Sequence, residues 1–200
     1  ADLKDAKNLG YPLLIKAAAG GGGKGMRIVT SPKNLKESVI SAQREALSGF
    51  GDDRIFIERY VKKSRHIEIQ ILGDEHGNIV HLGERECSIQ RRHQKIIEES
   101  PASDVSPDII QEMSRAAVEL SSKVNYEGAG TVEFIYDLDE KKFYFLEMNT
   151  RIQVEHPVTE LITNCDLIAM QIQFAFDRKK KFLQQKDITS YGHAIECRVY

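Results

Sequence analysis

The sequence has no tryptophan and only three cysteines among its 200 residues. Cys87, Cys165 and Cys197 are widely separated and form no CxxC pair, so a disulfide framework is not indicated. The sequence also contains no HExxH segment or histidine–cysteine cluster that would indicate zinc, and no GxSxG or Cys–His signature of acyl-enzyme chemistry. We expect reduced, buried thiols without a chemical role, in a protein of a reducing compartment.

Long apolar runs and an excess of either charge are also missing. No segment approaches the roughly 18 apolar residues that a membrane-spanning helix needs. Lys and Arg number 28 against 30 Asp and Glu, for a net charge of −2, so no basic field would attract nucleic acid or anionic lipid. We therefore predict neither membrane nor nucleic acid as a partner, and we interpret the RKKK run at 178–181 as the solvated end of a helix.

The composition is that of an ordinary globular protein, 41% hydrophobic and 29% charged. The length suits one domain, or two small ones that share a cleft. A helix-like stretch follows Ala1 at once, and the closing HAIECRVY alternates like an unfinished strand. We therefore expect this chain to be a fragment of a longer protein.

Hydrophobic periodicity predicts strands and hairpins with a few helices between them. Ser106 and Pro107 form a good helix start, with Ser as the cap and Pro in the first turn. No strict βαβ rhythm appears, so we predict the α+β class with largely antiparallel sheets. We expect strands at 11–16, 26–30, 55–61, 128–136 and 142–149, and a hairpin at 66–86 that turns at DEHGN. We expect helices at 34–48 and from 106 to about 125, and helical stretches from 159 to about 182.

The segment FLEMNTRIQVEHP (145–157) has polar side chains at every second position and mostly apolar ones between them. In an extended chain, alternate side chains point to opposite faces. One face would then carry a row of carboxylate, amide and guanidinium groups, although a half-exposed strand with a wet face is an alternative reading. The row consists of Glu147, Asn149, Arg151, Gln153 and Glu155.

Two acids face each other across the hairpin that contains this row. If the turn centres on Glu140, Glu133 and Glu147 pair directly, with Asn149 next along the same face. Opposed carboxylates repel each other, and two acids with an amide oxygen are hard ligands of the kind that Mg²⁺ or Mn²⁺ takes. The pattern predicts a metal site, unless the register is off by one and the acids point apart.

The loop KAAAGGGGKGM (16–26) holds five glycines between residues 20 and 25. Glycine amides can approach a ligand closely and suit phosphate oxygens. A strand rather than a helix follows the loop, so it is not a Rossmann fingerprint, and it lacks the Lys-Ser/Thr pair of a Walker A loop. We interpret it as a hairpin tip over a nucleotide, with Lys16 and Lys24 supplying charge; a plain flexible loop is the alternative.

The segment QRRHQK (90–95) concentrates positive charge at Arg91, Arg92 and Lys95, with His93 among them. It is too basic and too polar for a core element. It is either a solvent-facing loop or, if a phosphate site exists elsewhere, a clamp for anions.

The glycine loop, the paired acids and the EMNTRIQVEHPVTE row together resemble the ATP-grasp superfamily. More narrowly, the chain resembles biotin carboxylase, the ATP-dependent component or domain of biotin-dependent carboxylases. KAAAGGGGKGM, ERECSIQRRHQKIIEE and FLEMNTRIQVEHPVTE carry this resemblance, which covers essentially all of the chain. It implies an ATP-grasp fold of the α+β class, with a partial lid subdomain at 1–61 and a partial central subdomain, the larger antiparallel sheet with its helices, at 62–200.

The resemblance also implies a role for particular residues in nucleotide binding. Lys16 would contact the phosphates, Glu58 and Val61 the adenine, and His66 the ribose. Lys24 departs from many relatives, which have Arg, but either supplies positive charge. The remaining expected nucleotide contacts are Gly22, Gly23, Met26, Gln90 and His93, with Lys95 touching both nucleotide and bicarbonate.

The same resemblance assigns the polar row. Glu133, Glu147 and Asn149 match the Mg²⁺/Mn²⁺ ligands, in agreement with the hairpin register. The bicarbonate pocket corresponds to Arg151, Gln153 and Val154 together with Lys95. Glu155 corresponds to the general base, and Arg198 to the group that stabilises the biotin enolate.

The implied activity is ATP-dependent carboxylation of biotin with bicarbonate, through carboxyphosphate. The expected partners are a biotin carboxyl carrier and a carboxyltransferase, in a cytoplasmic homo-oligomer (mitochondrial matrix if eukaryotic). Two alternatives stay open: another ATP-grasp ligase of carbamoyl-phosphate type, and a nucleotide-binding fragment that is inactive alone. The family's N-terminal α/β domain, which supplies a further nucleotide lysine, and its C-terminal region are not in the sequence, and the resemblance does not indicate the final carboxyl acceptor.

Overall fold

The computed structural model describes residues 6, 8–19, 25–177 and 183–199. The glycine-loop prediction with Gly22, Gly23 and Lys24, and the prediction for 178–181, lie outside the described residues. Contacts divide the chain into two compact units, residues 1–62 with 91–94, and residues 63–90 with 95–200. Each unit is built on its own antiparallel sheet.

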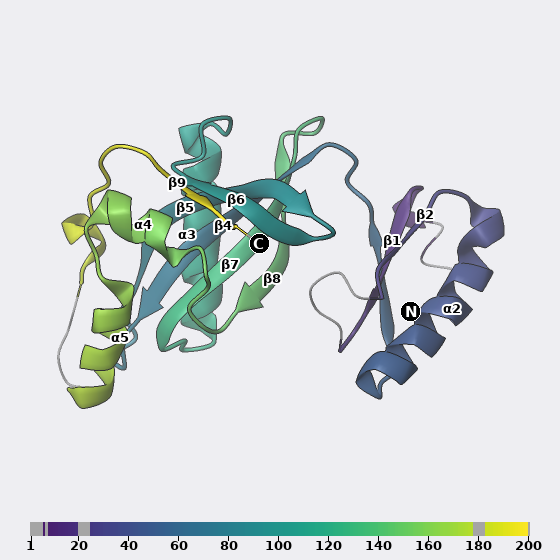
Figure 1. Cartoon of the computed structure of the whole chain (residues 1–200), viewed down its shortest axis with the longest axis horizontal. Helices are drawn as coiled ribbons and strands as arrows, with labels where there is room; N and C mark the ends of the chain where they lie inside the picture. The colour runs from purple at the N-terminus through teal and green to yellow at the C-terminus, as the bar shows by residue number, and fades with distance from the viewer. Residues whose placement is uncertain (1–5, 7, 20–24, 178–182, 200) are drawn as a thin grey trace. The chain divides into compact units, whose positions relative to one another are not determined.

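The first unit is a three-stranded sheet packed against one helix (Figure 1). Strand β1 (Leu13–Ala17) lies between β2 (Arg27–Val29) and β3 (Ile55–Arg59), and helix α2 spans Pro32–Phe50. The helix begins at Ser31, whose side chain accepts a hydrogen bond from the Lys33 amide, and it ends at Gly51 in the left-handed conformation. Leu13, Ile15 and Val29 from the sheet form a buried cluster with Leu35 and Ala42 of α2.

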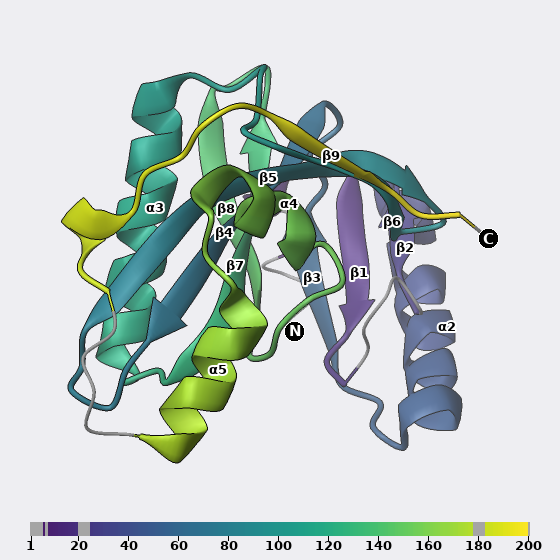
Figure 2. The same ribbon diagram turned by 60° about the vertical axis from the view of Figure 1, so that its left-hand side comes forward.

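The second unit contains a six-stranded sheet in the order β8-β7-β4-β5-β6-β9. Its helices lie on opposite faces: α3 packs on one and α5 on the other (Figures 1 and 2). The predicted α+β class with largely antiparallel sheets is therefore confirmed. The strands are β4 (Ser64–Gly73), β5 (Ile79–Arg91), β6 (Gln94–Ser100), β7 (Gly128–Asp137), β8 (Lys142–Asn149) and β9 (Ala194–Cys197); the helices are α3 (Pro107–Lys123), α4 (His156–Thr163) and α5 (Leu167–Phe176), with a short 3₁₀ turn at Gln185–Asp187.

Strand β4 divides the second unit into an apolar layer and a polar layer. Ile67, Ile69 and Ile71 point to the α3 side, where they pack with Met113 and Ala117 in the main core. The alternate residues, among them Glu68 and Gln70, are just as buried but point to the other face. The core thus supports the sheet from one side, and the opposite side carries these polar residues beside a smaller apolar cluster packed against α5.

The turn between β5 and β6 is a two-residue hairpin at Arg92 and His93, both of which have positive φ angles of 53° and 64°. Such a turn matches the right-handed twist of its strands. The basic segment is therefore the tip of a long β-hairpin, and His93 is exposed there.

The β7–β8 hairpin pairs Glu133 with Glu147, as predicted, but not for the predicted reason. Near the turn the pairing is Asp137 with Lys142, a register in which Glu133 would face Leu146. An irregularity between Glu133 and Phe134 shifts the ladder by one residue and brings the two acids opposite each other.

Two predictions about local structure were wrong, the extended row and the burial of all three cysteines. The extended row does not run through 145–157, because β8 ends at Asn149 and α4 begins at His156. The helical stretches expected from 159 are present as two helices, separated where Asn164 adopts a left-handed conformation. Of the cysteines, only Cys87 is buried, whereas Cys197 is exposed.

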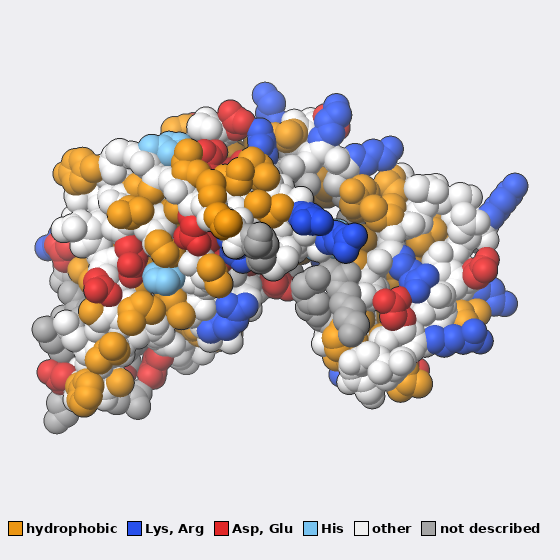
Figure 3. Space-filling view, in the orientation of Figure 1, with side chains coloured by type: hydrophobic (Ala, Val, Ile, Leu, Met, Phe, Trp, Pro, Cys, Tyr) orange, Lys and Arg blue, Asp and Glu red, His pale blue; other side chains and the backbone are white. Residues whose placement is uncertain are grey.

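Within the described part of the chain, no helix is long and apolar enough to cross a membrane. Several hydrophobic side chains are nevertheless exposed along α5, at the lower left of Figure 3, including Ile168, Ile172 and Phe176.

The contrast between the two environments gives a stability prediction. Ile69→Ala should lower the free energy of unfolding by about 2–5 kcal/mol, because it leaves a cavity in a fully buried site. Ile172→Ala, the same change at a side chain that is 53% exposed, should cost less than about 0.5 kcal/mol. Urea denaturation of both variants checks this, and equal losses would contradict the proposed core.

Candidate active site

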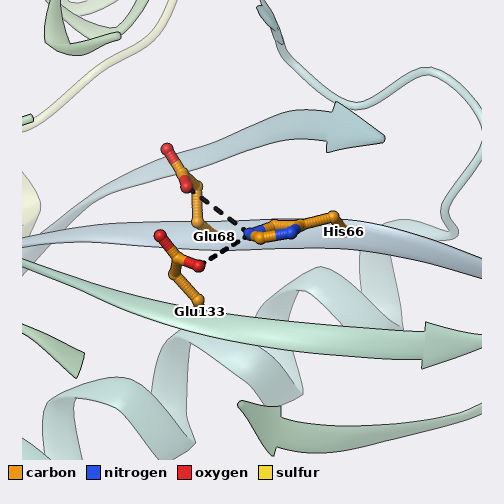
Figure 4. A group of neighbouring side chains, drawn as sticks. All are labelled: His66, Glu68 and Glu133. Atoms are coloured by element: carbon orange, nitrogen blue, oxygen red, sulfur yellow. Dashed lines mark ion pairs between the residues drawn. The ribbon is translucent and has the colours of Figure 1, made fainter. Parts of the chain in front are cut away.

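The register of the larger sheet aligns four charged residues in a row across neighbouring strands. Arg85 on β5 pairs with Glu68 on β4, Glu68 with Glu133 on β7, and Glu133 with Glu147 on β8. Directly paired residues share a face, so three carboxylates lie next to one another on the polar side. Figure 4 shows Glu68 and Glu133 converging beside His66. Because like charges destabilise a sheet, this row needs cations.

Lys95 on β6 supplies one of them. Its ammonium contacts Glu68, donates to Glu133 Oε1 over 2.8 Å and donates to Glu155 Oε1 over 2.6 Å. Burial lowers the pKa of Lys95, but Glu68, Cys87, Glu133 and Glu155 raise it more, so the net pKa lies above its usual value. Lys95 is therefore a cation at neutral pH and holds three carboxylates together.

Glu133 is the most heavily contacted of these acids. His66 Nε2 lies 2.9 Å from its Oε2, while Oε1 accepts from Lys95, from Asn149 Nδ2 at 3.0 Å and from Gln153 Nε2 at 2.8 Å. Burial raises the pKa of Glu133, but His66 and Lys95 outweigh it, so the net pKa lies well below the usual value. Glu133 is thus an ionised carboxylate.

Only some residues of the predicted row that lie between β8 and α4 contact this network. Gln153 and Glu155 are buried and reach the sheet, whereas Val154 is 61% exposed. Arg151 is exposed; its Nη2 donates to Asn149 Oδ1 over 3.3 Å and its Nη1 to the Ile152 carbonyl over 3.2 Å. The row is therefore presented by a loop, not by one face of a strand.

Arg198 ties Glu155 to a further buried acid. Its Nη2 lies 2.8 Å from Glu155 Oε2 and 2.5 Å from Glu98 Oε1. Burial raises the pKa of Glu155, but Lys95 and then Arg85 lower it more, so the net pKa is below the usual value. For Glu98, burial dominates over Arg198 and the net pKa is raised.

The three predicted metal ligands offer a suitable donor set. Glu133 and Glu147 are directly paired, and Asn149 donates from Nδ2 to Glu133 while its Oδ1, the atom that would bind a metal, accepts from Arg151. Two carboxylates and an amide oxygen are the hard ligands that Mg²⁺ and Mn²⁺ take while keeping waters and phosphate oxygens. The residues present therefore fit the ion.

A second set of candidate ligand atoms lies close by. His66, Glu68 and Glu133 each place one ligand atom within 4.8 Å of the others (Figure 4). Lys95 already contacts both of these carboxylates, and Arg85 Nε donates to Glu68 over 2.5 Å. Because this pocket is neutralised by side chains, the face toward Glu147 and Asn149 is the better position for a cation.

The predicted nucleotide contacts fall in both units. In the second, Gln90 Nε2 lies 3.1 Å from His66 Nδ1, so these two are brought together beside the acids. In the first, Lys16 Nζ lies 2.6 Å from Glu58 Oε2. Met26 and Val61 are partly exposed in that unit, and His93 is at the hairpin tip grouped with it.

Sequence reasoning missed Glu68, Arg85 and Glu98. The segment HIEIQ carries the same every-second-position pattern as the row that was singled out, so this signal could have found Glu68 and Gln70. No local pattern marks Arg85 or Glu98, because their importance comes only from the strands that pair beside them.

Comparison with known proteins gives a family for this geometry. Residues 1–182 match the family model described as carbamoyl-phosphate synthase L chain, ATP binding domain. The chain is 54% identical over 195 residues to methylcrotonoyl-CoA carboxylase subunit alpha, mitochondrial, of Rattus norvegicus, covering 98% of this chain and 27% of that protein. It is 51% identical over 197 residues to biotin carboxylase of a Nostoc species, covering 98% of this chain and 44% of that protein.

The structure also matches a solved one with a TM-score of 0.92 at 45% identity. That structure is the biotin carboxylase domain dimer of Hydrogenobacter thermophilus 2-oxoglutarate carboxylase in complex with MgADP, ADP and bicarbonate; the match covers 98% of this chain and 43% of that one. The chain thus spans less than half the length of these relatives. The ATP-grasp fold and the similarity to biotin carboxylase predicted from the sequence are confirmed, and the chain belongs to the family of carbamoyl-phosphate synthase L chain ATP binding domains.

Proposed function

We propose that this chain forms the central part of an enzyme that carboxylates biotin with bicarbonate at the expense of ATP. The observation that carries the proposal is the position of Lys95. One ammonium contacts both Glu133, a proposed metal ligand, and Glu155, the proposed base. The groups needed for phosphoryl transfer and for activation of bicarbonate therefore lie within reach of a single side chain.

Bicarbonate is held by Arg151, Gln153 and the Val154 backbone, with Lys95 adding positive charge. Glu155 removes the bicarbonate proton, and the resulting oxygen attacks the γ-phosphorus of ATP. The bond from this phosphorus to the β,γ-bridging oxygen breaks, which gives carboxyphosphate and ADP. Such transfers depend on alignment and on neutralisation of charge rather than on covalent catalysis by the protein.

Carboxyphosphate then breaks at its carbon–oxygen bond to release CO₂ and phosphate. The phosphate takes the N–H proton of biotin, and the biotin enolate attacks the carbon of CO₂ to give carboxybiotin. Arg198 steadies the negative charge on the enolate oxygen. In the structure Arg198 bridges Glu98 and Glu155. It is already a cation there, so it can exchange these carboxylates for a substrate anion without any change in its protonation.

The low pKa of Glu155 suits a group that must be ionised before it can accept a proton. Its carboxylate is already bound by Lys95 and Arg198 at 2.6 Å and 2.8 Å. Anionic substrates that draw these two cations away would raise the basicity of Glu155 at the moment it is needed.

Glu133, Glu147 and Asn149 would hold Mg²⁺ or Mn²⁺, which neutralises charge on the ATP phosphates when bound. Each of the two units contains some of the remaining proposed nucleotide contacts. Residues 1–61 act as a lid that excludes water from carboxyphosphate, and 62–200 as the central subdomain. The proposed contacts are Lys16, Gly22, Gly23, Met26, Glu58, Val61, His66, Gln90 and His93.

The proposed partners are a biotin carboxyl carrier and a carboxyltransferase, because the biotin must be brought to the site and its carboxyl group passed on. We also propose a homo-oligomeric full-length protein in the cytoplasm, or in the mitochondrial matrix in a eukaryote. For the isolated 200 residues we expect little or no turnover, because they span less than half the length of the relatives.

The competing proposal is a ligase of carbamoyl-phosphate type, which also uses bicarbonate and ATP. The family description alone fits it, whereas the relative at 51% identity named biotin carboxylase favours biotin. Measuring ATP hydrolysis with and without free biotin separates the two. Stimulation by biotin supports the first proposal, and stimulation by an ammonia donor instead would support the second.

A first prediction concerns the base. Glu155→Gln in the full-length protein should lower kcat for bicarbonate-dependent ATP hydrolysis by about 100-fold or more, because general-base catalysis is lost. ATP binding, measured by calorimetry, should change little. The matched control is Glu112→Gln, at an exposed position on α3 on the far side of the sheet; normal turnover of Glu155→Gln would remove Glu155 as the base.

A second prediction concerns Arg151. Arg151→Lys should reduce carboxylation by about 10-fold or more, since an ammonium cannot reproduce the two-pronged contact of a guanidinium with a planar anion. Steady-state kinetics with varied bicarbonate checks this. Arg115→Lys, an exposed change on α3, is the control, and unchanged rates for Arg151→Lys would refute the assigned role.

A further inference from the structure

Arg85 is a fully buried guanidinium at the end of the acidic row, and all of its hydrogen-bonding capacity is used. A guanidinium has five N–H donors and no acceptor. Arg85 makes five side-chain hydrogen bonds, to Glu68 at 2.5 Å, Gln70 at 2.6 Å, Thr159 at 3.0 Å, Thr131 at 3.1 Å and Gln153 at 3.2 Å. A buried cation is tolerated only when it is satisfied in this way.

These five acceptors come from four different parts of the second unit. Glu68 and Gln70 lie on β4, Thr131 on β7, Gln153 in the loop after β8, and Thr159 on α4. Arg85 therefore fastens the loop at 150–155 and the start of α4 to the polar face of the sheet. This loop carries the residues proposed to bind bicarbonate.

The bond to Gln153 has a specific consequence for the polarity of the site. A glutamine amide has an oxygen at one end and an NH₂ group at the other, and either could face the site. Arg85 can only donate, so it takes the oxygen of Gln153; the NH₂ group then points to Glu133, with Nε2 to Oε1 at 2.8 Å. Arg85, which only donates, and the ionised Glu133, which only accepts, together select one of two amide orientations.

We propose that Arg85 is a positioning residue that fixes the Gln153 side chain with its N–H donors on the side of Glu133, where the proposed function places the bound anion. The inference rests on the proposed function, in which that anion is bicarbonate. With the opposite orientation, an amide oxygen would face a negatively charged substrate and a donor would face the Arg85 guanidinium. Arg85 thus acts on the substrate only through Gln153.

Arg85→Lys in the full-length protein tests this role. Lysine keeps the charge beside Glu68 but offers three donors instead of five, and its single ammonium cannot span the acceptors on both sides. We expect the KM for bicarbonate to rise about 10-fold or more, while the KM for ATP stays within about 2-fold. A general loss of folding would instead lower kcat and the active fraction without shifting one KM selectively.

A double-mutant cycle shows whether Arg85 acts through Gln153. Gln153→Ala alone and Arg85→Lys with Gln153→Ala should have nearly the same KM for bicarbonate, because residues in one network are not additive. Arg115→Lys, an exposed change on α3 outside this network, is the control and should leave this KM unchanged. Fully additive effects, or an unchanged KM in Arg85→Lys, would overturn the proposal.

If Arg85→Lys does not fold, Gln153→Glu provides an independent test. Glutamate keeps the acceptor for Arg85 but has no donor when ionised, so the KM for bicarbonate should again rise about 10-fold or more. An unchanged KM would show that donor polarity at this position does not matter. Absence of bicarbonate-dependent ATP hydrolysis in the wild type would instead refute the proposed function itself.

Discussion

The candidate site depends on the balance between three adjacent buried acids and two cations, the fully buried Arg85 and the partly exposed Lys95. Glu68 and Glu133 are paired neighbours in the sheet, and Glu155 reaches them from the loop before α4. Left alone, these carboxylates would repel one another and would pay a large desolvation cost. Lys95 contacts all three, and Arg85 binds Glu68 from the other side. Without the two cations, this face of the sheet could not remain buried and ionised.

The apolar layer on the opposite face makes this arrangement sustainable. Ile67, Ile69 and Ile71 alternate with the polar residues of β4 and are completely buried against α3. Burial of apolar area is the main favourable contribution to folding, whereas a buried ionic network contributes little net stability. The sheet is therefore held by this core on one side and by a smaller apolar cluster with α5 on the other, and the polar part of that second side can be used for function. This division explains why β4 is buried on both faces.

Sequence patterns predicted the parts of this site that are governed by local rules. The pairing of Glu133 with Glu147 follows from strand alternation, but it is realised through an irregularity at Phe134 that no pattern indicates. The row at 145–157 was identified correctly as polar, yet its second half is a loop in which Gln153 and Glu155 turn inward and Arg151 stays exposed. Arg85 and Glu98 could not be found, because their roles arise from neighbours distant in sequence. Local periodicity sets which face a residue occupies, while tertiary pairing decides what it meets there.

The acids of this site are neutralised by the protein's own cations, and this affects how the site can respond to its substrates. Glu155 is held by Lys95 and Arg198, and Arg198 also contacts Glu98. A substrate anion that enters this network competes with these carboxylates for the same two cations, and whichever acid is released has a higher affinity for protons. Arg85 cannot take part in this exchange, because it is completely buried and all its donors are bound. The network therefore combines one fixed cation, which sets geometry, with two partly exposed cations that can transfer their contacts from protein to substrate.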